Sequence, residues 1–355
     1  MKDLIARLVR KEDLSQEEAA RGMTLIMEGR ATEAQIAAFL MGLRLKGETS
    51  DEITGCARVM RQKALRIDID REVIDLDRDD INVDRETIID TCGTGGDGTN
   101  TFNVSTATAF VVAGAGCLVA KHGNRSVSSS CGSADVVRSL GINLDLEPAE
   151  VKQCVEKVGI GFFYAPLYHS AMKFALPVRV QLGIRTIFNL LGPLSNPAGA
   201  NVQVMGVYSR ELTTLMAEVL RNLGCRSALV VYGEGSFDEI SIVGRTFIAH
   251  LKEGAVSNYQ VSPEDFGFAP AGLETIRGGS AEVNARIILE VLGGTPGPRR
   301  NMVLMNAAAV FLAAGRVADW KAGIALAGHT IDSGQALGRL EALIEFTNRF
   351  AVKEK

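Results

Sequence analysis

The sequence predicts an α/β protein in which a small N-terminal helical subdomain precedes a larger α/β domain with a central, mostly parallel sheet. Residues 1–66 have apolar side chains at helical spacing, whereas short β-branched runs alternate with helical segments from Thr87 onward. Strands that alternate with helices are typical of parallel sheets, because a parallel connection needs a crossover. The chain has 355 residues, of which 46% are apolar, so it can bury a large core.

Three capping-box patterns predict helix starts in residues 1–66. They are Ser15-x-x-Glu18, Thr32-x-x-Gln35 and Thr49-x-x-Glu52. In each pattern two side chains would satisfy backbone N–H groups that have no partner at a helix start. The alanine- and leucine-rich faces of these helices favour a packing or dimer surface over a catalytic role.

Residues 67–86 are predicted to form an acidic linker. Its segment Asp68–Asp84 contains eight carboxylates and only two arginines. Four acidic residues of the linker match a calcium-loop template, but Asp80 stands where the sharp turn needs glycine. We therefore favour a solvated linker over a calcium site.

The α/β domain is expected to span residues 87–355. Strands are predicted at 87–90, 117–120, 161–164, 202–208 and 228–232, and residues 240–251 could supply strands or a hairpin. Ser170–Leu191 reads as a long, helix-rich crossing, and we expect helices from about 166–191 to join the helical subdomain in space. The remainder of the chain is predicted to be helical.

Composition excludes several classes of protein. The net charge of −4 and the lack of any basic run argue against nucleic-acid binding. No stretch reaches the roughly 18 apolar residues that a membrane span needs, and the first residues have no signal-peptide pattern. The six cysteines contain no CxxC pair, which argues against disulfides and zinc and predicts a reduced, cytoplasmic protein.

A glycine-rich loop follows the first predicted strand and reads Gly93-Thr94-Gly95-Gly96-Asp97-Gly98. Such a loop exposes backbone N–H groups and permits close approach of a phosphate, although a simple turn is the plain alternative. It is neither a Walker A loop nor a GxGxxG fingerprint, because no Gly-Lys-Ser/Thr follows and the spacing differs. Asp97 would fit a ligand that carries hydroxyls or an amine beside its phosphates.

Polar residues also follow the later strands, and each has two interpretations. Asn103–Thr106 could cap a helix or bind a phosphate or metal at the helix start. Lys121 could be a snorkelling surface charge or could hold a pyrophosphate. Asp238 and Glu239 could be solvated acids or Mg²⁺ ligands. Arg179 could be a surface arginine or could bind a carboxylate through two parallel hydrogen bonds.

Taken together, these motifs resemble those of the anthranilate phosphoribosyltransferases. The resemblance is carried by GTGGD at 93–97, NVST at 103–106, KHGNR at 121–125, GSAD at 132–135, PVR at 177–179, RTIFNLLGP at 185–193 and Asp238-Glu239. It implies an enzyme that transfers phosphoribose from phosphoribosyl pyrophosphate to anthranilate in tryptophan biosynthesis. The implied fold is related to that of pyrimidine nucleoside phosphorylases, and the implied assembly is a homodimer formed through the helical subdomain.

The resemblance also implies roles for individual residues. Ser105, Asp238 and Glu239 would bind Mg²⁺, with two ions bridged by the pyrophosphate. Gly93, Asn124 and Arg179 would hold anthranilate, with the arginine facing its carboxylate. Lys121 would act electrostatically, and no covalent nucleophile is expected. The site for phosphoribosyl pyrophosphate would be lined by Gly93, Gly96, Asp97, Thr101, Asn103, Val104, Ser105, Thr106, Lys121, His122, Gly123, Asn124, Arg125, Ser126, Val127, Ser128, Ser129 and Ser133.

Three positions depart from the family pattern. Tyr168 stands before His169 where a histidine pair is common, Phe174 replaces a frequent histidine, and Cys131 replaces a usual serine. The first two are expected near anthranilate, so they bear on acceptor selectivity. His122 could orient the acceptor or could be structural.

Two other functions remain as alternatives for the whole chain. One is a nucleoside phosphorylase, and the other is a non-catalytic phosphosugar-binding protein.

Overall fold

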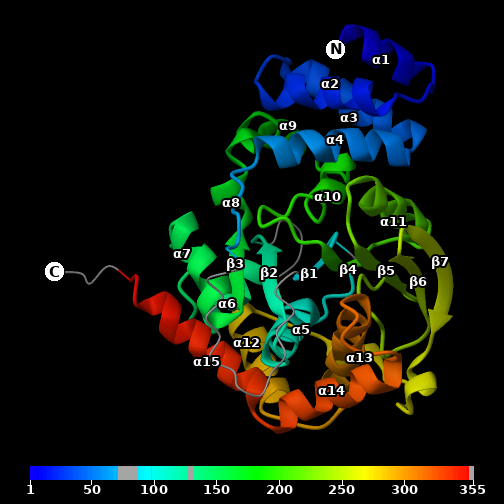
Figure 1. Ribbon diagram of the computed structural model, residues 1–355. Helices are drawn as coiled ribbons and strands as arrows, with labels where there is room; N and C mark the ends of the chain where they lie inside the picture. The colour runs from blue at the N-terminus through cyan, green and yellow to red at the C-terminus, as the bar shows by residue number, and fades with distance from the viewer. Residues whose placement is uncertain (71–86, 97, 126–130, 352–355) are drawn as a thin grey trace.

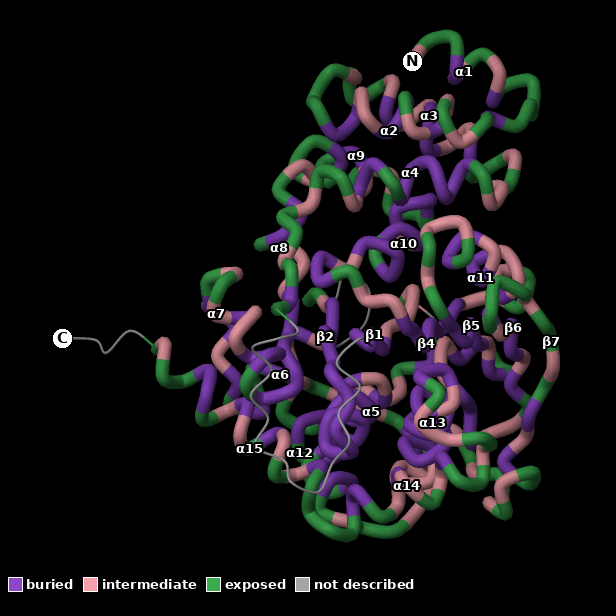
Figure 2. The backbone as a smooth tube through the Cα atoms, viewed as in Figure 1, coloured by how far each residue is buried: buried purple, intermediate pink, exposed green. Residues whose placement is uncertain are grey.

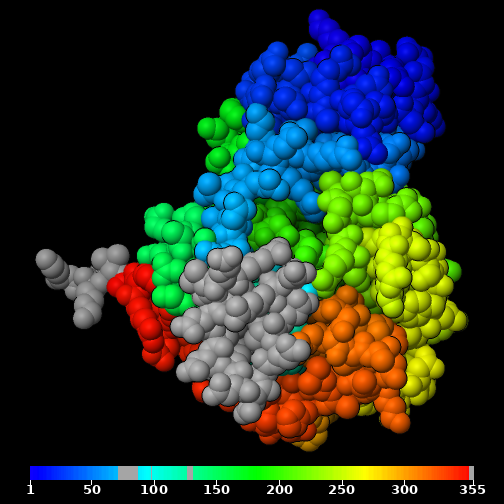
Figure 3. All heavy atoms as spheres, viewed as in Figure 1, coloured from blue at the N-terminus to red at the C-terminus, as the bar shows by residue number. Residues whose placement is uncertain are grey.

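The computed structural model describes residues 1–70, 87–96, 98–125 and 131–351. The N-terminal helices form a lobe at the top of the molecule, above a larger body built around one sheet (Figures 1 and 3). The acidic linker lies largely outside the described residues, because the description stops at Asp70 and resumes at Thr87. The predicted fold class, a helical bundle followed by an α/β domain with a mostly parallel sheet, is confirmed.

Four helices make up the N-terminal lobe: α1 (Lys2–Val9), α2 (Gln16–Met27), α3 (Glu33–Lys46) and α4 (Ser50–Lys63). All three predicted capping boxes are present and begin α2, α3 and α4, each with a backbone N–H donating to the capping hydroxyl at 3.3 Å. These bonds satisfy donors that would otherwise lack partners at the helix starts.

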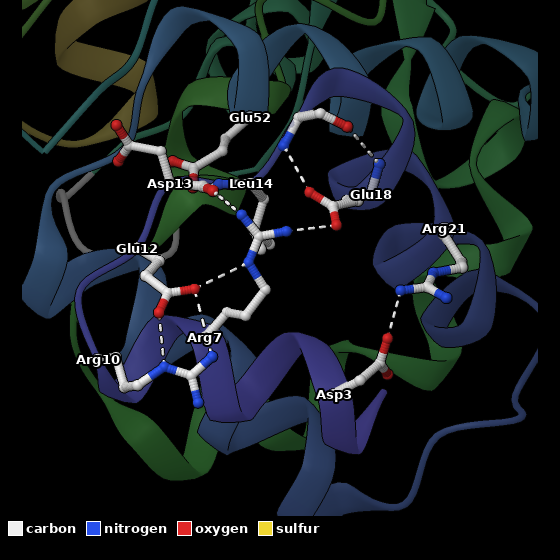
Figure 4. Close-up of polar contacts among 10 residues, drawn as sticks. Asp3, Arg7, Arg10, Glu12, Asp13, Leu14, Glu18, Arg21 and Glu52 are labelled. Atoms are coloured by element: carbon white, nitrogen blue, oxygen red, sulfur yellow. Dashed lines mark hydrogen bonds and ion pairs between the residues drawn. The ribbon is translucent and has the colours of Figure 1, made fainter.

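Polar contacts join α1 and α2 to the start of α4 (Figure 4). Arg7 donates to Glu12 at 3.2 Å and also contacts Glu18. Glu52 is fully buried and accepts from the backbone N–H of Leu14 at 2.9 Å and from Lys46 at 2.9 Å. Exposed ion pairs contribute little to the free energy of unfolding. The hydrogen bonds of the buried Glu52 therefore stabilise the packing of these helices more than the exposed pairs do.

The sheet has seven strands in the order β3-β2-β1-β4-β5-β6-β7. The first five are parallel to one another, whereas β6 and β7 are antiparallel. The strands are β1 (Ile88–Gly93), β2 (Leu118–Gly123), β3 (Ile160–Tyr164), β4 (Val202–Gly206), β5 (Ser227–Gly233), β6 (Thr246–Lys252) and β7 (Ala255–Val261). The five predicted parallel strands are therefore all present.

The expectation that the chain after residue 251 is entirely helical is wrong. β7 pairs with β6 through a two-residue turn in which Glu253 and Gly254 have φ of 51° and 76°. Positive φ at both positions is the geometry of a tight hairpin turn. β7 is an edge strand with mostly exposed polar side chains, so it lacks the apolar run that revealed the other strands.

The two faces of the sheet pack into two hydrophobic cores. Along β5, Leu229 and Val231 belong to one core, whereas Ala228 and Val230 belong to the other. This alternation follows from the two-residue period of a strand. The first core lies under α5 and the C-terminal helices, and the second joins α11, α10 and the N-terminal lobe; both appear as buried backbone in Figure 2.

The remaining helices complete these two layers. The 170–191 crossing is broken into three pieces rather than being one long helix, because Pro177 lies in the first turn of the second piece and Gly183, with φ of 62°, ends it. The pieces are η2 (Ser170–Phe174), α9 (Leu176–Leu182) and α10 (Ile187–Leu191). The others are α5 (Val104–Gly114), α6 (Ser133–Ser139), α7 (Pro148–Gln153), η1 (Cys154–Val158), α8 (Ala165–Tyr168), α11 (Leu212–Asn222), η3 (Pro263–Phe266), η4 (Leu273–Ile276), α12 (Ala281–Leu292), α13 (Pro298–Ala313), α14 (Trp320–Asp332) and α15 (Gln335–Asn348).

Two chain segments fasten the N-terminal lobe to the body. α9 packs against α3, and α10 and α11 pack against α4. Val178 of α9 and Phe188 of α10 share a core with the first four helices. Among the described helices, none combines the length and apolar character that crossing a bilayer requires.

Candidate active site at the carboxyl edge of the sheet

The site lies where β1 and β4 run side by side. On its other side β1 pairs with β2, whereas β4 pairs with β5. From this central pair the sheet therefore grows in opposite directions, which makes the β1–β4 boundary a topological switch point. Ligands of open α/β sheets bind at such a switch point, beyond the carboxyl ends of the strands. β1 and β4 both end in glycine, and a Cβ atom on Gly93 or Gly206 would collide with Asp238. The two glycines therefore allow the Asp238 loop to lie directly on the strand ends.

The loop after β5 holds the glycine-rich loop in place. Asp238 Oδ2 accepts a hydrogen bond from the backbone N–H of Gly95 at 2.9 Å. Gly95 and Gly96 have φ of 65° and 70°, a backbone conformation that glycine adopts without strain. The carboxylate and the predicted phosphate loop thus come from segments 143 residues apart and meet at one point.

The neighbouring carboxylate reaches the start of α5. Glu239 Oε1 accepts from the backbone N–H of Ser105 at 3.1 Å. The side chain of the same serine accepts from Lys121 Nζ at 3.2 Å, and Lys121 also donates to the carbonyl of Thr91 at 2.5 Å. Ser105, Lys121, Asp238 and Glu239 therefore form one connected polar group over the ends of β1, β2 and β5. The interpretation of Lys121 as a surface charge is wrong, because its side chain is only 3% exposed.

Asp90 is a buried carboxylate beside this group. It is fully buried in β1 and accepts from the backbone N–H of His122 at 3.2 Å. Burial raises the pKa of Asp90 to about 6, against the opposing effect of the Lys121 charge. Burial lowers the pKa of Lys121, whereas the negative charges of Asp90 and Glu239 oppose that change. An anionic ligand at Lys121 would favour its charged form further.

Asp238, Glu239 and Ser105 supply oxygen donors suited to Mg²⁺. Carboxylate and hydroxyl oxygens are hard ligands, and Mg²⁺ takes about six ligands while keeping several waters. Three protein groups leave room in that shell for phosphate oxygens and water. The donor set therefore fits a magnesium ion held jointly by the protein and a phosphorylated ligand. Within the described ranges, no cluster of three or more His, Cys, Asp or Glu side chains could hold a metal.

The start of α5 is anchored to α12. Asn103 Oδ1 accepts from Asn284 Nδ2 at 2.9 Å and from the thiol of Cys131 at 3.6 Å. Asn103 precedes the helix but forms no side-chain cap bond, so its capping role is not observed. Thr101 forms a short antiparallel bridge with Arg277.

Val104 and Thr106 are 1% exposed. Both residues therefore belong to the packing of α5.

The end of β2 meets the start of α6. A Cβ atom on Gly123 would collide with the hydroxyl of Ser133. The carbonyl of Asn124 accepts from the backbone N–H of Ala134 at 3.1 Å and from the Ser133 hydroxyl at 3.4 Å. The guanidinium of Arg125 lies 6.0 Å from the ring centre of Tyr164. These contacts bring the predicted 121–125 motif and Ser133 together.

Two histidines meet beside the site. His122 of β2 and His169 have their Nε2 atoms 3.2 Å apart, so one ring donates to the other. Burial lowers the pKa of His122 to about 3 and that of His169 to about 4. Both rings are therefore neutral at pH 7. Tyr168 does not join them, because its ring is 1% exposed and packs on Phe163.

The segment from α9 to α10 extends from the N-terminal lobe to the glycine-rich loop. Arg179 of α9 lies over the ring of Phe188 at 5.2 Å, and burial lowers its pKa. Arg185 donates to the carbonyl of Gly96 and stacks on Tyr208 at 4.3 Å. This segment could therefore hold a second ligand facing the loop. Phe174 packs instead near Gly29 of the N-terminal lobe.

Five predicted ligand residues lie outside the described residues: Asp97, Ser126, Val127, Ser128 and Ser129. Conversely, sequence reasoning gave no role to three residues that the structure places at the site. Arg185 was part of a recognised motif, and Asp90 could have been noticed as a carboxylate inside an apolar strand. Asn284 carried no local signal, because its contact depends on α12 packing beside α5.

Comparison with known proteins gives the family. Residues 85–337 match the glycosyl transferase family, a/b domain, and residues 2–64 match the helical bundle domain of that family. The anthranilate phosphoribosyltransferase of Symbiobacterium thermophilum is 54% identical over 349 residues, which cover 98% of this chain and 98% of that protein. The chain belongs to the anthranilate phosphoribosyltransferase family.

Solved members of this family share the whole fold. The Thermus thermophilus anthranilate phosphoribosyltransferase matches with a TM-score of 0.88 and 39% identity, covering 98% of this chain and 99% of that one. The Saccharomyces cerevisiae enzyme, solved in complex with PRPP and Mg, matches with a TM-score of 0.85 and 28% identity, covering 98% of both chains. The same yeast enzyme has been solved in complex with 4-fluoroanthranilate.

Family membership decides between the functions that the sequence left open. The chain is a glycosyltransferase-family enzyme, as the resemblance implied. A nucleoside phosphorylase and a non-catalytic phosphosugar-binding protein are not favoured, because relatives matching the full length at over 50% identity are anthranilate phosphoribosyltransferases.

Proposed function

We propose that this chain transfers the 5-phosphoribosyl group from phosphoribosyl pyrophosphate to the amine of anthranilate, giving N-(5-phosphoribosyl)anthranilate and pyrophosphate in tryptophan biosynthesis. The observation that carries the proposal is the connected group of Lys121, Ser105, Asp238 and Glu239 at the carboxyl edge of the sheet. This group combines a buried cation with a pair of metal-binding acids. A diphosphate with its magnesium requires both.

The donor occupies the loops at the ends of β1 and β2. Backbone N–H groups of the glycine-rich loop face its phosphates, as such loops do elsewhere. The start of α6 at Ser133 closes the other side, because Gly123 leaves space for that hydroxyl. The donor-binding residues are those that the family resemblance implies, with Lys121 opposite the pyrophosphate.

The acceptor lies between the glycine-rich loop and α9. Arg179 binds the anthranilate carboxylate, since a guanidinium can form two parallel hydrogen bonds to it. Gly93 and Asn124 line the same slot from the strand ends. The neutral His122 and His169 pair forms part of its wall on the side of β2.

The reaction breaks the bond from the anomeric carbon to the pyrophosphate oxygen and forms a bond from that carbon to the amine nitrogen. The bonding electrons leave with pyrophosphate, and the proton that the amine loses passes to pyrophosphate or to water. Lys121, which is buried and already oriented by its hydrogen bonds to Thr91 and Ser105, and the loop N–H groups stabilise the negative charge on the departing group. Holding the two substrates in line supplies a further part of the rate enhancement.

Magnesium, when bound, neutralises charge on the pyrophosphate. We propose two ions, held by Asp238, Glu239 and Ser105. The protein's task is to fix these oxygens, and the backbone N–H groups of Gly95 and Ser105 do so by orienting the carboxylates.

The decisive experiment follows the loss of anthranilate fluorescence when phosphoribosyl pyrophosphate and Mg²⁺ are added. Turnover is expected only when both are present, and Lys121→Met is expected to abolish most of it. Lys152→Met is a suitable control, because that lysine lies on α7 and pairs with Glu156. Phosphorolysis of a nucleoside without consumption of anthranilate would refute the proposal.

We also propose a cytoplasmic homodimer formed through a helical subdomain of residues 1–66 and the helices of about 166–191. Three apolar side chains support this interface: Val9 of α1, Leu45 of α3 and Val180 of α9 are 76%, 73% and 70% exposed. These exposed apolar side chains all lie on the helices proposed to form the interface, where a partner subunit would cover them. All six cysteines are free thiols, which fits a reducing compartment. Sedimentation equilibrium is expected to give a dimer that Leu45→Asp shifts towards monomer.

A further inference from the structure

A second cationic cavity lies on the molecule away from the active site. It has a volume of about 290 Å³ and is lined by Arg58, Arg61, Gln62, Arg66, Asn222 and Leu223. Asn222 ends α11, the helix that runs from the carboxyl end of β4 back to the start of β5. The cavity therefore lies towards the amino edge of the sheet, opposite the edge that carries Asp238 and Lys121.

The lining of this cavity contains three arginines and no carboxylate. Burial lowers the pKa of Arg61, and the positive charge of Arg66 lowers it further. Like charges held together in a partly desolvated place repel one another, and a bound anion would relieve that repulsion. The charge balance of the cavity thus favours an anionic ligand.

Two of the three arginines, Arg58 and Arg61, are held in position before any ligand binds. Arg61 Nε donates to the carbonyl of Leu194 at 2.6 Å, and Nη1 donates to that of Leu223 at 3.1 Å. Arg58 donates to the carbonyl of Asn222 at 3.4 Å. A guanidinium has five N–H donors, so these bonds fix the Arg61 plane while leaving further donors for a ligand. Ordering costs of binding are reduced when the side chains are already fixed.

We propose that the cavity is a binding site for a tetrahedral oxyanion, either free phosphate or the phosphoryl group of a small metabolite. Planar guanidinium groups match phosphate oxygens through paired hydrogen bonds. Arg58 and Arg61 belong to α4, Arg66 to the chain that leaves it, and Asn222 to α11 of the α/β domain. A bound oxyanion would therefore join the N-terminal lobe to the body where α4 packs on α11 (Figure 1).

The test compares thermal unfolding of the full-length protein in phosphate, in glycerol 3-phosphate and in potassium chloride at equal ionic strength. The wild type is expected to show a saturable rise in Tm of about 2 °C or more in at least one phosphate solution, beyond the effect of chloride. Free phosphate and a phosphomonoester carry the same kind of oxyanion. The solution that gives the larger rise in Tm therefore identifies which of the two the cavity prefers. No response beyond chloride would overturn the proposal.

Variants separate this cavity from the active site, which can also bind phosphate. Arg58→Gln with Arg66→Gln is expected to lose most of the Tm rise while keeping the kinetics of anthranilate consumption. Both arginines are exposed, so the fold should tolerate the change. Arg286→Gln with Lys321→Gln alters the net charge equally on exposed faces of α12 and α14 and is expected to respond like the wild type. A wild-type response in the first variant, or an equal loss in the second, would refute the site.

Discussion

Asp238 and Glu239 are adjacent in sequence, yet each carboxylate reaches a different element. Asp238 accepts from Gly95 in the glycine-rich loop, and Glu239 accepts from Ser105 at the start of α5. Two adjacent acids repel each other unless donors or cations lie close to them. Here the backbone N–H groups of Gly95 and Ser105 and the charge of Lys121 offset the repulsion between the two carboxylates. A bound metal ion would offset it further.

Replacing Asp238 by asparagine is expected to lower kcat/KM by roughly 10²-fold, equivalent to about 2.7 kcal/mol of transition-state stabilisation. The amide keeps the size of the side chain but loses the charge that holds the metal. A magnesium titration of the initial rate measures the effect, which should shrink at high Mg²⁺. Glu234→Gln is the control, because this exposed residue of the same loop pairs only with Arg245 among the described side chains. Equal Mg²⁺ dependence in Asp238→Asn and the wild type would remove Asp238 from the metal site.

Arg179→Ala is expected to raise KM for anthranilate by roughly 10-fold or more while leaving KM for the donor nearly unchanged. Hydrogen bonds to a charged group are worth about 1.5–3 kcal/mol, and this one is made only to the acceptor. Steady-state kinetics with each substrate varied in turn measures the two constants. Gln181→Ala, an exposed position on the same helix, should change neither. Equal increases in both constants would contradict the assignment.

At the scale of elements, the ends of β1 and β4 decide where the acidic loop can lie. Both strands end in glycine beside Asp238, and Gly206 faces the backbone of Asp238 directly. The close approach excludes a side chain at either position. The glycines are therefore part of the site, even though they offer no functional group.

Gly206→Ala is expected to destabilise the protein by about 1–3 kcal/mol, because the added methyl group would overlap the Asp238 carbonyl. It should also lower kcat/KM by moving that residue away from the glycine-rich loop. Denaturant unfolding and initial rates measure the two effects. Gly192→Ala is the matched control, since a Cβ there meets no atom within 4 Å and its φ is −53°. Wild-type stability and activity in Gly206→Ala would show that the loop can retreat without cost.

Elements with a strong local signal could be predicted, whereas others could not. The helix starts at Ser15, Thr32 and Thr49 were visible because a capping box is made by residues three apart. β7 was missed because an exposed edge strand needs no apolar run. Its turn residues, Glu253-Gly254, were the one signal that could have revealed it.

At the scale of the whole molecule, burial of the histidine pair links stability to pH. The pKa of His169 falls from 6.5 to about 4 on folding, chiefly through burial. The unfolded chain therefore takes up a proton between these values while the folded chain does not. The resulting stability is fully present above pH 6.5 and is lost as the pH falls through this window.

His169→Gln is expected to reduce the loss of unfolding free energy between pH 7 and pH 4 by about 3 kcal/mol, because glutamine does not titrate. Urea unfolding at a series of pH values measures this slope. His329→Gln changes an exposed histidine on α14 and should leave the slope nearly unchanged. A slope in His169→Gln that equals the wild-type slope would show that folding does not lower the pKa of His169.

The sequence by itself determined the helical start of the chain, the positions of the five parallel strands along it and the polar loops that follow them, because these features depend on residues close together along the chain. Only the tertiary structure decided that Asp238 lies on Gly93 and Gly206, that Arg185 reaches Gly96, and that Asn284 holds Asn103. The last two contacts join residues 89 and 181 positions apart. Such contacts arise from how whole helices and strands pack, and no local period or motif records that packing.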